Sequence, residues 1–306
     1  MDKIIIGICT HYRNNTLKIC LEKIQEMNIP SNVFIEIVIT DDTKEAFGIK
    51  HFCKKKYKFK IHFNASHTTG IASARNSLLK KCLELNPDYI AFIDDDEFPD
   101  KNWIKNYYEY IKTSNADILA GPVISKFVDS NLKETKVPNY IYKNKLFNLH
   151  QKRNSGEPYS TCATSNVFLK TSILKNSSHK FDENFKKMSG EDIDFFERLT
   201  KTGYKLLWCK EASVYEHVTP DRCTLKYILK RQFNNGYLRI FMKRKNNTLK
   251  NKNHFNTVIN ILISSFSLPF SIFLGKTIFT RNLGFCAFNF GALNSTFNNK
   301  TYNFYK

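Results

Sequence analysis

The chain has 306 residues and a formal net charge of +19, from 47 Lys and Arg against 28 Asp and Glu. This length allows a buried core in one or two domains. Its eight cysteines are scattered without a CxxC pair or a His/Cys metal spacing. That pattern argues against a zinc site or a disulfide scaffold and fits a reducing compartment, with the cytoplasm as the default.

The positive charge is concentrated at the end of the chain. Residues 1–221 hold 33 Lys and Arg against all 28 acids, whereas Arg222–Lys306 holds 14 Lys and Arg and no acid. This asymmetry predicts an anionic partner for the C-terminal tail, either membrane phospholipid or nucleic acid.

The first elements alternate between strand and helix patterns. Lys3–Thr10 is apolar and predicts a buried strand, followed by the polar turn Thr10–Arg13. Leu17–Met27 has its apolar residues at the spacing of a helix packed on a sheet. Val33–Thr40 predicts a second strand, which ends at Asp41 and Asp42, and Lys60–Phe63 predicts a short third strand.

A run of four acids marks the centre of the pattern. Gly70 opens a predicted helix, and the buried strand Tyr89–Ile93 then leads directly into Asp94, Asp95, Asp96 and Glu97. Adjacent carboxylates repel one another, and a divalent cation carrying a phosphorylated ligand would offset that repulsion. A solvated acidic turn closed by Pro99 is the alternative interpretation.

Further alternation predicts a mostly parallel sheet. A helix is expected around Trp103–Lys112 and a strand at Asp117–Val123. The carboxyl ends of such strands line one crevice where ligands bind. Neither GxGxxG nor GxxxxGK[ST] is present, which disfavours a dinucleotide-binding dehydrogenase and a P-loop NTPase.

The second half carries weaker signals. A strand is expected at Asn166–Leu169, and the segment 187–194 leads into a predicted helix at Phe195–Thr200. Ser189 and Asp192 have the spacing of a helix capping box, which is an alternative to a functional role for these acids. Lys205–Ala212 predicts another strand, followed by a turn that contains His217, Pro220 and Arg222.

The tail combines a basic and an apolar segment. Lys226–Lys252 contains nine Lys and Arg, and Phe255–Gly275 has no charged residue over 21 positions. A helix lying in the cytoplasmic leaflet explains both features, with a single membrane span and a soluble core helix as the alternatives. We expect Asn282–Lys306 to be poorly ordered.

Several motifs, in this order, resemble those of the family 2 inverting glycosyltransferases of the GT-A fold. The turn Thr10–Arg13 is similar to the family's first-strand element. The other similar segments are EIVITDDT (36–43), GIASARN (70–76), FIDDDEFP with its DXD motif (92–99), GEDIDF (190–195) and EHVTPDRCTLKYILKRQFNNG (216–236). The segment 216–236 resembles one found in family members that build exopolysaccharide or lipopolysaccharide.

This resemblance implies roles for particular residues. Those implied to bind the donor nucleotide are Thr10, Tyr12, Arg13, Asp42, Arg75, Asp94 and Asp95. Those implied to bind Mn²⁺ or Mg²⁺ are Asp96, Asp94 and His217, with Arg222 at the diphosphate. Asp192 is the implied general base, and Glu191 the alternative base.

The resemblance also implies an organisation and a function. Residues 1–235 would form the catalytic domain, with a nucleotide-sugar half (1–123) and an acceptor half (124–235), and residues 236–306 the membrane-associating tail. The implied enzyme is a hexosyltransferase that moves a sugar, most simply from a UDP-sugar, to a lipid-linked or surface glycan at the inner face of the plasma membrane. A nucleic-acid-binding protein and a sugar-1-phosphate nucleotidyltransferase are the alternatives; no RRM, KH or zinc signature supports the first, and no Gly-rich loop follows the first strand for the second.

Overall fold

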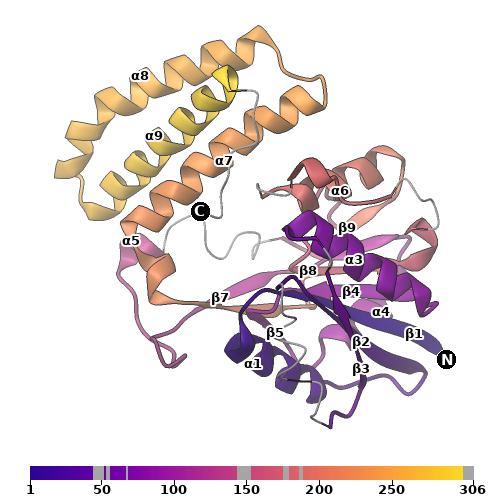
Figure 1. Ribbon diagram of the computed structural model, residues 1–306. Coiled ribbons are helices and arrows are strands. Elements are labelled where there is room, and N and C mark those ends of the chain that lie inside the picture. The colour runs from indigo at the N-terminus through magenta and orange to yellow at the C-terminus, as the bar shows by residue number, and fades with distance from the viewer. Residues whose placement is uncertain are drawn as a thin grey trace. The chain divides into compact units, whose positions relative to one another are not determined.

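The chain forms two compact units in the computed structural model, and each is described by itself (Figure 1). Unit 1 comprises Met1–Ile124 and Asn148–Glu216, and unit 2 comprises Ser125–Phe147 and His217–Lys306. The described residues are 1–43, 52, 56–66, 68–142, 153–174, 179–185 and 189–298.

Unit 1 is built on a seven-stranded sheet in the order β3-β2-β1-β4-β8-β6-β9. All neighbouring pairs are parallel except those of β8, which is antiparallel to both β4 and β6. The mostly parallel sheet expected from the alternation is confirmed. Its strands are β1 (Asp2–Thr10), β2 (Val33–Asp41), β3 (Lys60–Ala65), β4 (Tyr89–Ile93), β6 (Ile118–Ala120), β8 (Asn166–Lys170) and β9 (Leu206–Trp208).

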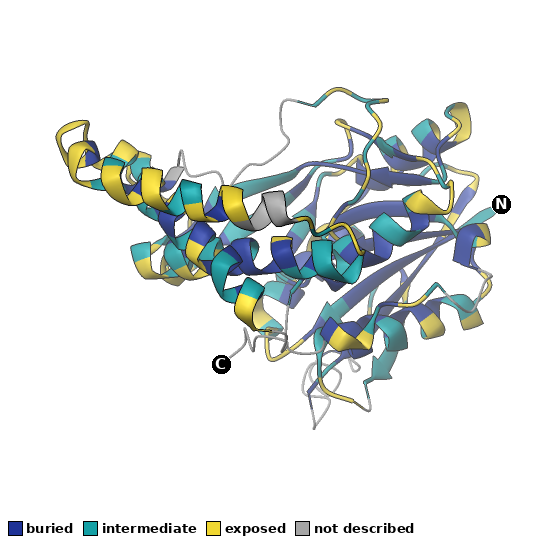
Figure 2. Cartoon of the chain, turned by 90° about the horizontal axis from the view of Figure 1, so that it is seen from above, coloured by how far each residue is buried: buried dark blue, intermediate teal, exposed yellow. Residues whose placement is uncertain are grey.

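Within the described ranges, four helices of more than ten residues pack on this sheet, with two on each face. They are α1 (Asn14–Gln25), α3 (Ile71–Glu84), α4 (Trp103–Thr113) and α6 (Glu191–Lys201). Alternate residues of β1 enter different cores: Ile4 joins the apolar side chains of α1 and α4, and Ile5 joins those of α3 and α6. A strand buried on both faces is apolar along its whole length, which explains the run of isoleucines (Figure 2).

A second, three-stranded sheet has the order β5-β10-β7, formed by β5 (Glu97–Pro99), β10 (Val214–Val218) and β7 (Val123–Phe127). The prediction of a single strand at Asp117–Val123 is wrong. Two short strands, β6 and β7, replace it, because Pro122 has no N–H for a sheet ladder. His217 lies on β10 rather than in the predicted turn, and Arg222 lies in the 3-10 helix η3 (Pro220–Cys223).

Unit 2 contains α5 (Asn139–Tyr142), α7 (Leu225–Lys245), α8 (Asn251–Phe273) and α9 (Lys276–Phe297). Helix α9 packs against α5, α7 and α8. The expectation of a poorly ordered end from Asn282 is therefore wrong as far as Phe297, and residues 299–306 lie outside the described residues. The predicted boundary at residue 235 falls inside α7, so the division into catalytic domain and tail stays a prediction.

Asn166 connects three parts of unit 1. Its side-chain Oδ1 accepts hydrogen bonds from Trp103 Nε1 at 2.8 Å and Tyr107 Oη at 2.7 Å. Its Nδ2 donates to the carbonyls of Pro122 at 3.0 Å and Ala212 at 2.8 Å. Because the whole amide is buried and fully paired, it fixes the start of β8 against α4 and the two loops.

We expect Asn166→Ala to lower the free energy of unfolding by about 3 kcal/mol, because it leaves several buried polar groups without a partner. Chemical denaturation measures this change. Asn184→Ala, on an exposed residue, is the matched control and should change stability by less than about 0.5 kcal/mol. Equal changes in the two variants would show that the buried amide has no special role.

Candidate active site

Three strand ends of unit 1 meet at one edge of the sheet. Thr10 at the end of β1 is in register with Asp41 at the end of β2, and β4 pairs with the other side of β1. Asp94 follows the last residue of β4 directly. The sequence order thus brings the acids after β2 and β4 to the same edge as the Thr10 turn.

The acid cluster is held by two side chains from the β1–α1 turn. Thr10 Oγ1 donates a buried hydrogen bond of 2.8 Å to Asp95 Oδ2. Arg13 Nη1 lies 3.0 Å from Asp95 Oδ1 and 3.0 Å from Asp96 Oδ2. One guanidinium therefore offsets the repulsion between two neighbouring carboxylates.

Loss of solvation makes Asp94, Asp95 and Glu97 hold their protons more firmly than exposed carboxyls do. Burial raises the pKa of Asp95 to about 6, against the opposing effects of the Arg13 charge and the Thr10 hydrogen bond. Burial, and then the charges of Asp94 and Asp96, raise the pKa of Glu97 well above its ordinary value. The pKa of Asp94 is also raised, chiefly by burial and with Arg75 opposing. A cation entering this cluster competes with protons for the carboxylates.

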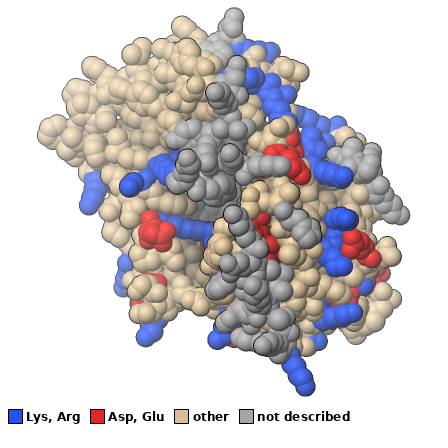
Figure 3. Space-filling view, viewed as in Figure 1, with Lys and Arg blue, Asp and Glu red and all other residues tan. Residues whose placement is uncertain are grey.

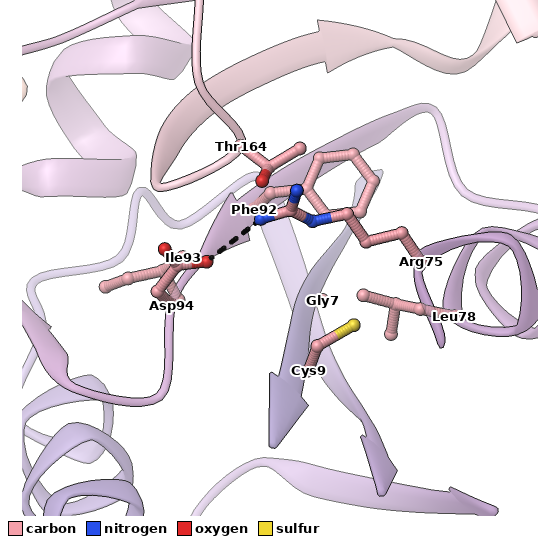
Figure 4. Close-up of a pocket in the computed structure, with 8 residues that line it drawn as sticks. All are labelled: Gly7, Cys9, Arg75, Leu78, Phe92, Ile93, Asp94 and Thr164. Atoms are coloured by element: carbon pink, nitrogen blue, oxygen red, sulfur yellow. Dashed lines mark ion pairs between the residues drawn. The ribbon is translucent and has the colours of Figure 1, made fainter. Parts of the chain in front are cut away.

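Arg75 is a buried cation shared by three acids. It lies on α3 and forms an ion pair with Glu191. Its Nη2 is 3.6 Å from Asp94 Oδ1, and its Nη1 is 3.9 Å from Asp192 Oδ2. Figure 4 shows the Arg75 side chain extending toward Asp94 across a small pocket also lined by Thr164. A single guanidinium thus links α3, the end of β4 and the start of α6.

The start of α6 differs from its prediction. The helix begins at Glu191 rather than Phe195, and its N-cap is Gly190, in a left-handed conformation with φ 108° and without a side-chain cap. The alternative interpretation of Ser189 and Asp192 as a capping box is therefore wrong, because Gly190, in a left-handed conformation, is the N-cap of α6. Glu191 is only 2% exposed, whereas the Asp192 side chain is 17% exposed.

The end of β2 presents two acids in different settings. Asp41 is fully buried and accepts a hydrogen bond of 2.9 Å from the Thr43 backbone N–H. Asp42 Oδ2 accepts one of 3.1 Å from the N–H of Gly70, which opens α3. Its other oxygen, Oδ1, is buried and has no hydrogen-bond partner among the residues that the structure describes. Burial raises the pKa of Asp42, so an additional donor would stabilise its charged form.

Tyr12 lies beside this acid edge as an exposed aromatic residue. Its side chain follows β1, is 59% exposed and packs edge-on against His11, with ring centroids 4.9 Å apart. The backbone at Tyr12 has φ 55°, a left-handed conformation that is uncommon for a residue with a Cβ. Such strain is maintained only where the surroundings require it, and it turns the chain sharply after β1.

The predicted site residues separate into two groups. Thr10, Tyr12, Arg13, Asp42 and Arg75 lie in unit 1, as do Asp94, Asp95, Asp96, Glu191 and Asp192. His217 and Arg222 lie in unit 2, so their places at the metal and the diphosphate stay predictions.

Three contributors were not identified from the sequence. The backbone N–H of Gly70 reaches Asp42, Gly190 sets the start of α6, and Thr164 lines the pocket with its Oγ1 buried and without a hydrogen-bond partner in the described part of the chain. No motif marks Thr164. Cys9 also lines the pocket, and burial raises the pKa of its thiol to about 12, which makes it a poor nucleophile.

Known proteins are similar to this chain in sequence and in fold. The profile of "Glycosyl transferase family 2" matches residues 5–177. "Succinoglycan biosynthesis protein ExoM" of Rhizobium meliloti is 27% identical over 234 residues, which cover 76% of this chain and 72% of that protein. "Glycosyltransferase GlyA" of Streptococcus pneumoniae serotype 4 is 27% identical over 123 residues, 39% of this chain but only 16% of that protein.

A solved structure of S. aureus TarS (residues 1–349) in complex with UDP superposes with a TM-score of 0.51 at 16% identity, covering 95% of this chain and 90% of that one. The fold and the family match together define a glycosyltransferase with a GT-A-like α/β fold. The chain belongs to glycosyl transferase family 2.

We expect Arg75→Leu to lower the free energy of unfolding by about 3–5 kcal/mol, because it leaves the carboxylate of Glu191 buried without its cation. The double variant Arg75→Leu/Glu191→Leu should recover much of this loss, since no lone charge then stays buried. Urea denaturation of the two variants measures both effects.

Lys23→Leu removes an exposed ion pair with Glu26 and serves as the control, with an expected loss below about 1 kcal/mol. A double variant less stable than Arg75→Leu alone would contradict the pairing.

Proposed function

We propose that this glycosyltransferase moves a sugar from a nucleoside diphosphate sugar to an acceptor hydroxyl, with inversion at the anomeric carbon and with a divalent cation. The observation that carries the proposal is the meeting of the Asp94–Asp96 cluster, Asp42 and the Arg75-linked start of α6 at one sheet edge. UDP is the first nucleotide to test, because a protein of similar fold has been solved with it.

The end of β2 suits the nucleotide base. Asp42 Oδ1 is buried without a hydrogen-bond donor in the described part of the chain, and an N–H on the edge of a nucleotide base would supply one. The exposed ring of Tyr12 offers a surface for the face of the base. Thr10 and Arg13 act through Asp95 and Asp96, to which their side chains are already hydrogen-bonded, and so position the cluster.

The acid cluster suits Mg²⁺ or Mn²⁺. Within the described ranges no three His, Cys, Asp or Glu side chains gather that could hold a metal ion by themselves. Such ions are commonly held by one or two carboxylates together with substrate phosphates, which matches Asp94 and Asp96. A bound ion would supply positive charge to the leaving nucleoside diphosphate. Arg75 would add charge beside the same group, since it already lies 3.6 Å from Asp94.

Asp192 is the proposed general base. It is more accessible than Glu191, whose carboxylate is buried in its ion pair with Arg75. The acceptor oxygen bonds to the anomeric carbon while the bond from that carbon to the diphosphate breaks. The acceptor proton passes to Asp192, and the bonding electron pair leaves with the diphosphate. Glu191 then has a positioning role, because it holds Arg75.

The acceptor and the location extend this proposal. A relative in succinoglycan biosynthesis supports a lipid-linked or surface glycan as the acceptor. The uneven charge of the chain supports an anionic membrane as the partner of the tail, at the cytoplasmic face. Family membership favours sugar transfer over a nucleic-acid-binding protein or a nucleotidyltransferase.

Calorimetric titration of the full chain with UDP, with and without Mn²⁺, tests the donor site. Binding should require Mn²⁺ and be lost in Asp96→Ala, because Asp96 would hold the cation, whose charge would favour the diphosphate. Glu109→Ala, an exposed carboxylate on α4, is the matched control and should bind as the wild type does. Equal binding without the ion would contradict metal dependence, and absence of UDP binding would direct the test to GDP and dTDP.

Asp192→Asn should bind UDP with unchanged affinity but reduce transfer by about a thousandfold, because an amide cannot accept the acceptor proton. Glu197→Gln on the same helix is the control and should retain transfer. Once a donor sugar is identified, release of UDP in the presence of acceptor measures the rate. Near-normal transfer by Asp192→Asn would exclude it as the base.

A further inference from the structure

Helix α8 has its polar and apolar sides reversed relative to a helix in water. From Phe255 to Phe273, where the burial of the side chains is described, its buried residues are Thr257, Ser264 and Ser271, which recur every seven positions on one side. Its exposed side carries large apolar residues, among them Phe266 at 76% and Phe273 at 88% exposure. A helix of a water-soluble protein buries its apolar stripe and exposes its polar one.

The two buried serine hydroxyls are hydrogen-bonded within the helix itself. Ser264 Oγ donates to the Ile261 carbonyl at 3.1 Å, and Ser271 Oγ donates to the Leu268 carbonyl at 2.6 Å. Small residues with internally paired hydroxyls let helices pack closely, as they do in membranes. The side of α8 that carries these hydroxyls is buried, and α8 packs against α9.

The packing of α9 on α7 follows the same rule. A Cβ on Gly236 would lie 1.8 Å from the Phe288 carbonyl oxygen, and one on Gly291 would lie 1.8 Å from that of Phe233. Both glycines therefore mark places where the two helix backbones are in contact. The three helices thus pack through small residues, while α8 directs its large side chains outward.

The exposed stripe is continuous and uncharged. Its largest members are Phe255, Leu262, Phe266, Phe270, Phe273 and Leu274. Figure 3 shows the surface over α8 without charged side chains, and Figure 2 shows most of this helix exposed. Phe255–Phe273 is long and apolar enough to cross a bilayer by length and composition. Basic residues flank it at Lys250, Lys252 and Lys276, and no acid follows Asp221.

We propose that the exposed stripe of α8, together with Leu274 in the turn to α9, is in contact with the hydrocarbon interior of an anionic bilayer. A helix lying on the membrane surface keeps a polar side in water, whereas the polar side of α8 is buried in the protein. Lys250 and Lys276 then lie at the level of the anionic headgroups. This inference refines the membrane part of the proposed function and is independent of its chemistry.

Flotation of the full chain with lipid vesicles tests the inference. The protein should float with vesicles of equal parts phosphatidylcholine and phosphatidylglycerol and stay bound after a wash in about 1 M salt, where the Debye length is about 3 Å. Leu262→Glu/Phe266→Glu should lower the bound fraction about tenfold or more, because a charge in hydrocarbon is costly. Phe34→Glu, the same change on an exposed phenylalanine of β2, should float as the wild type does.

Release by salt, or unchanged flotation of the double variant, would overturn the inference. A discrete dimer that does not float and that the double variant dissociates would assign the stripe to a second copy of the chain, and would also overturn it. UDP titration of the same proteins separates membrane contact from donor binding. A wild-type protein that floats but does not bind UDP supports the membrane contact and contradicts UDP as the donor nucleotide.

Discussion

The arrangement of unit 1 depends on offsetting negative charge that the fold concentrates at one sheet edge. Asp94, Asp95, Asp96 and Glu97 follow β4 without a break, and the pKa values of Asp94, Asp95 and Glu97 are raised, chiefly by loss of solvation. Such repulsion in a low-dielectric setting would disrupt the edge unless cations compensated for it. Arg13 and Arg75, which both precede the cluster in the chain, provide that compensation through Asp95 and Asp96 and through Asp94 respectively.

The two arginines have different consequences. Arg13 is half exposed, and its guanidinium pairs with Asp95 and Asp96 within the acid cluster. Arg75 is buried and is shared by Asp94, Glu191 and Asp192, so it ties the strand end to α6. The proposed donor site and proposed base are therefore connected through one side chain. Glu191 pairs with Arg75 and offsets its positive charge, while the adjacent Asp192 stays accessible.

Local patterns in the sequence predicted the first half of the fold. The β1–α1–β2 alternation, α3, β4 and α4 follow from apolar periodicity, and the order of the strands brought Thr10, Asp42 and Asp94 to one edge. The capping box at Ser189 failed because a left-handed Gly190 makes the turn, and pattern alone does not reveal that conformation. The antiparallel direction of β8 and the pairing of Arg75 with Glu191, 116 positions away, depend on long-range packing that no local motif encodes.

The same limit explains the tail. Asn282–Phe297 is rich in asparagine and glycine, which have low intrinsic helix propensity, and its composition therefore suggested disorder. In the structure this segment is the second part of α9, and its Gly291 lies directly against the backbone of Phe233. Residues that weaken a helix in isolation here permit close packing between helices. In a soluble protein, a helix is expected to bury its apolar side and to contain few glycines, and α8 and α9 do not match this expectation. Helices that pack through small residues and direct large apolar side chains toward lipid match both α8 and α9.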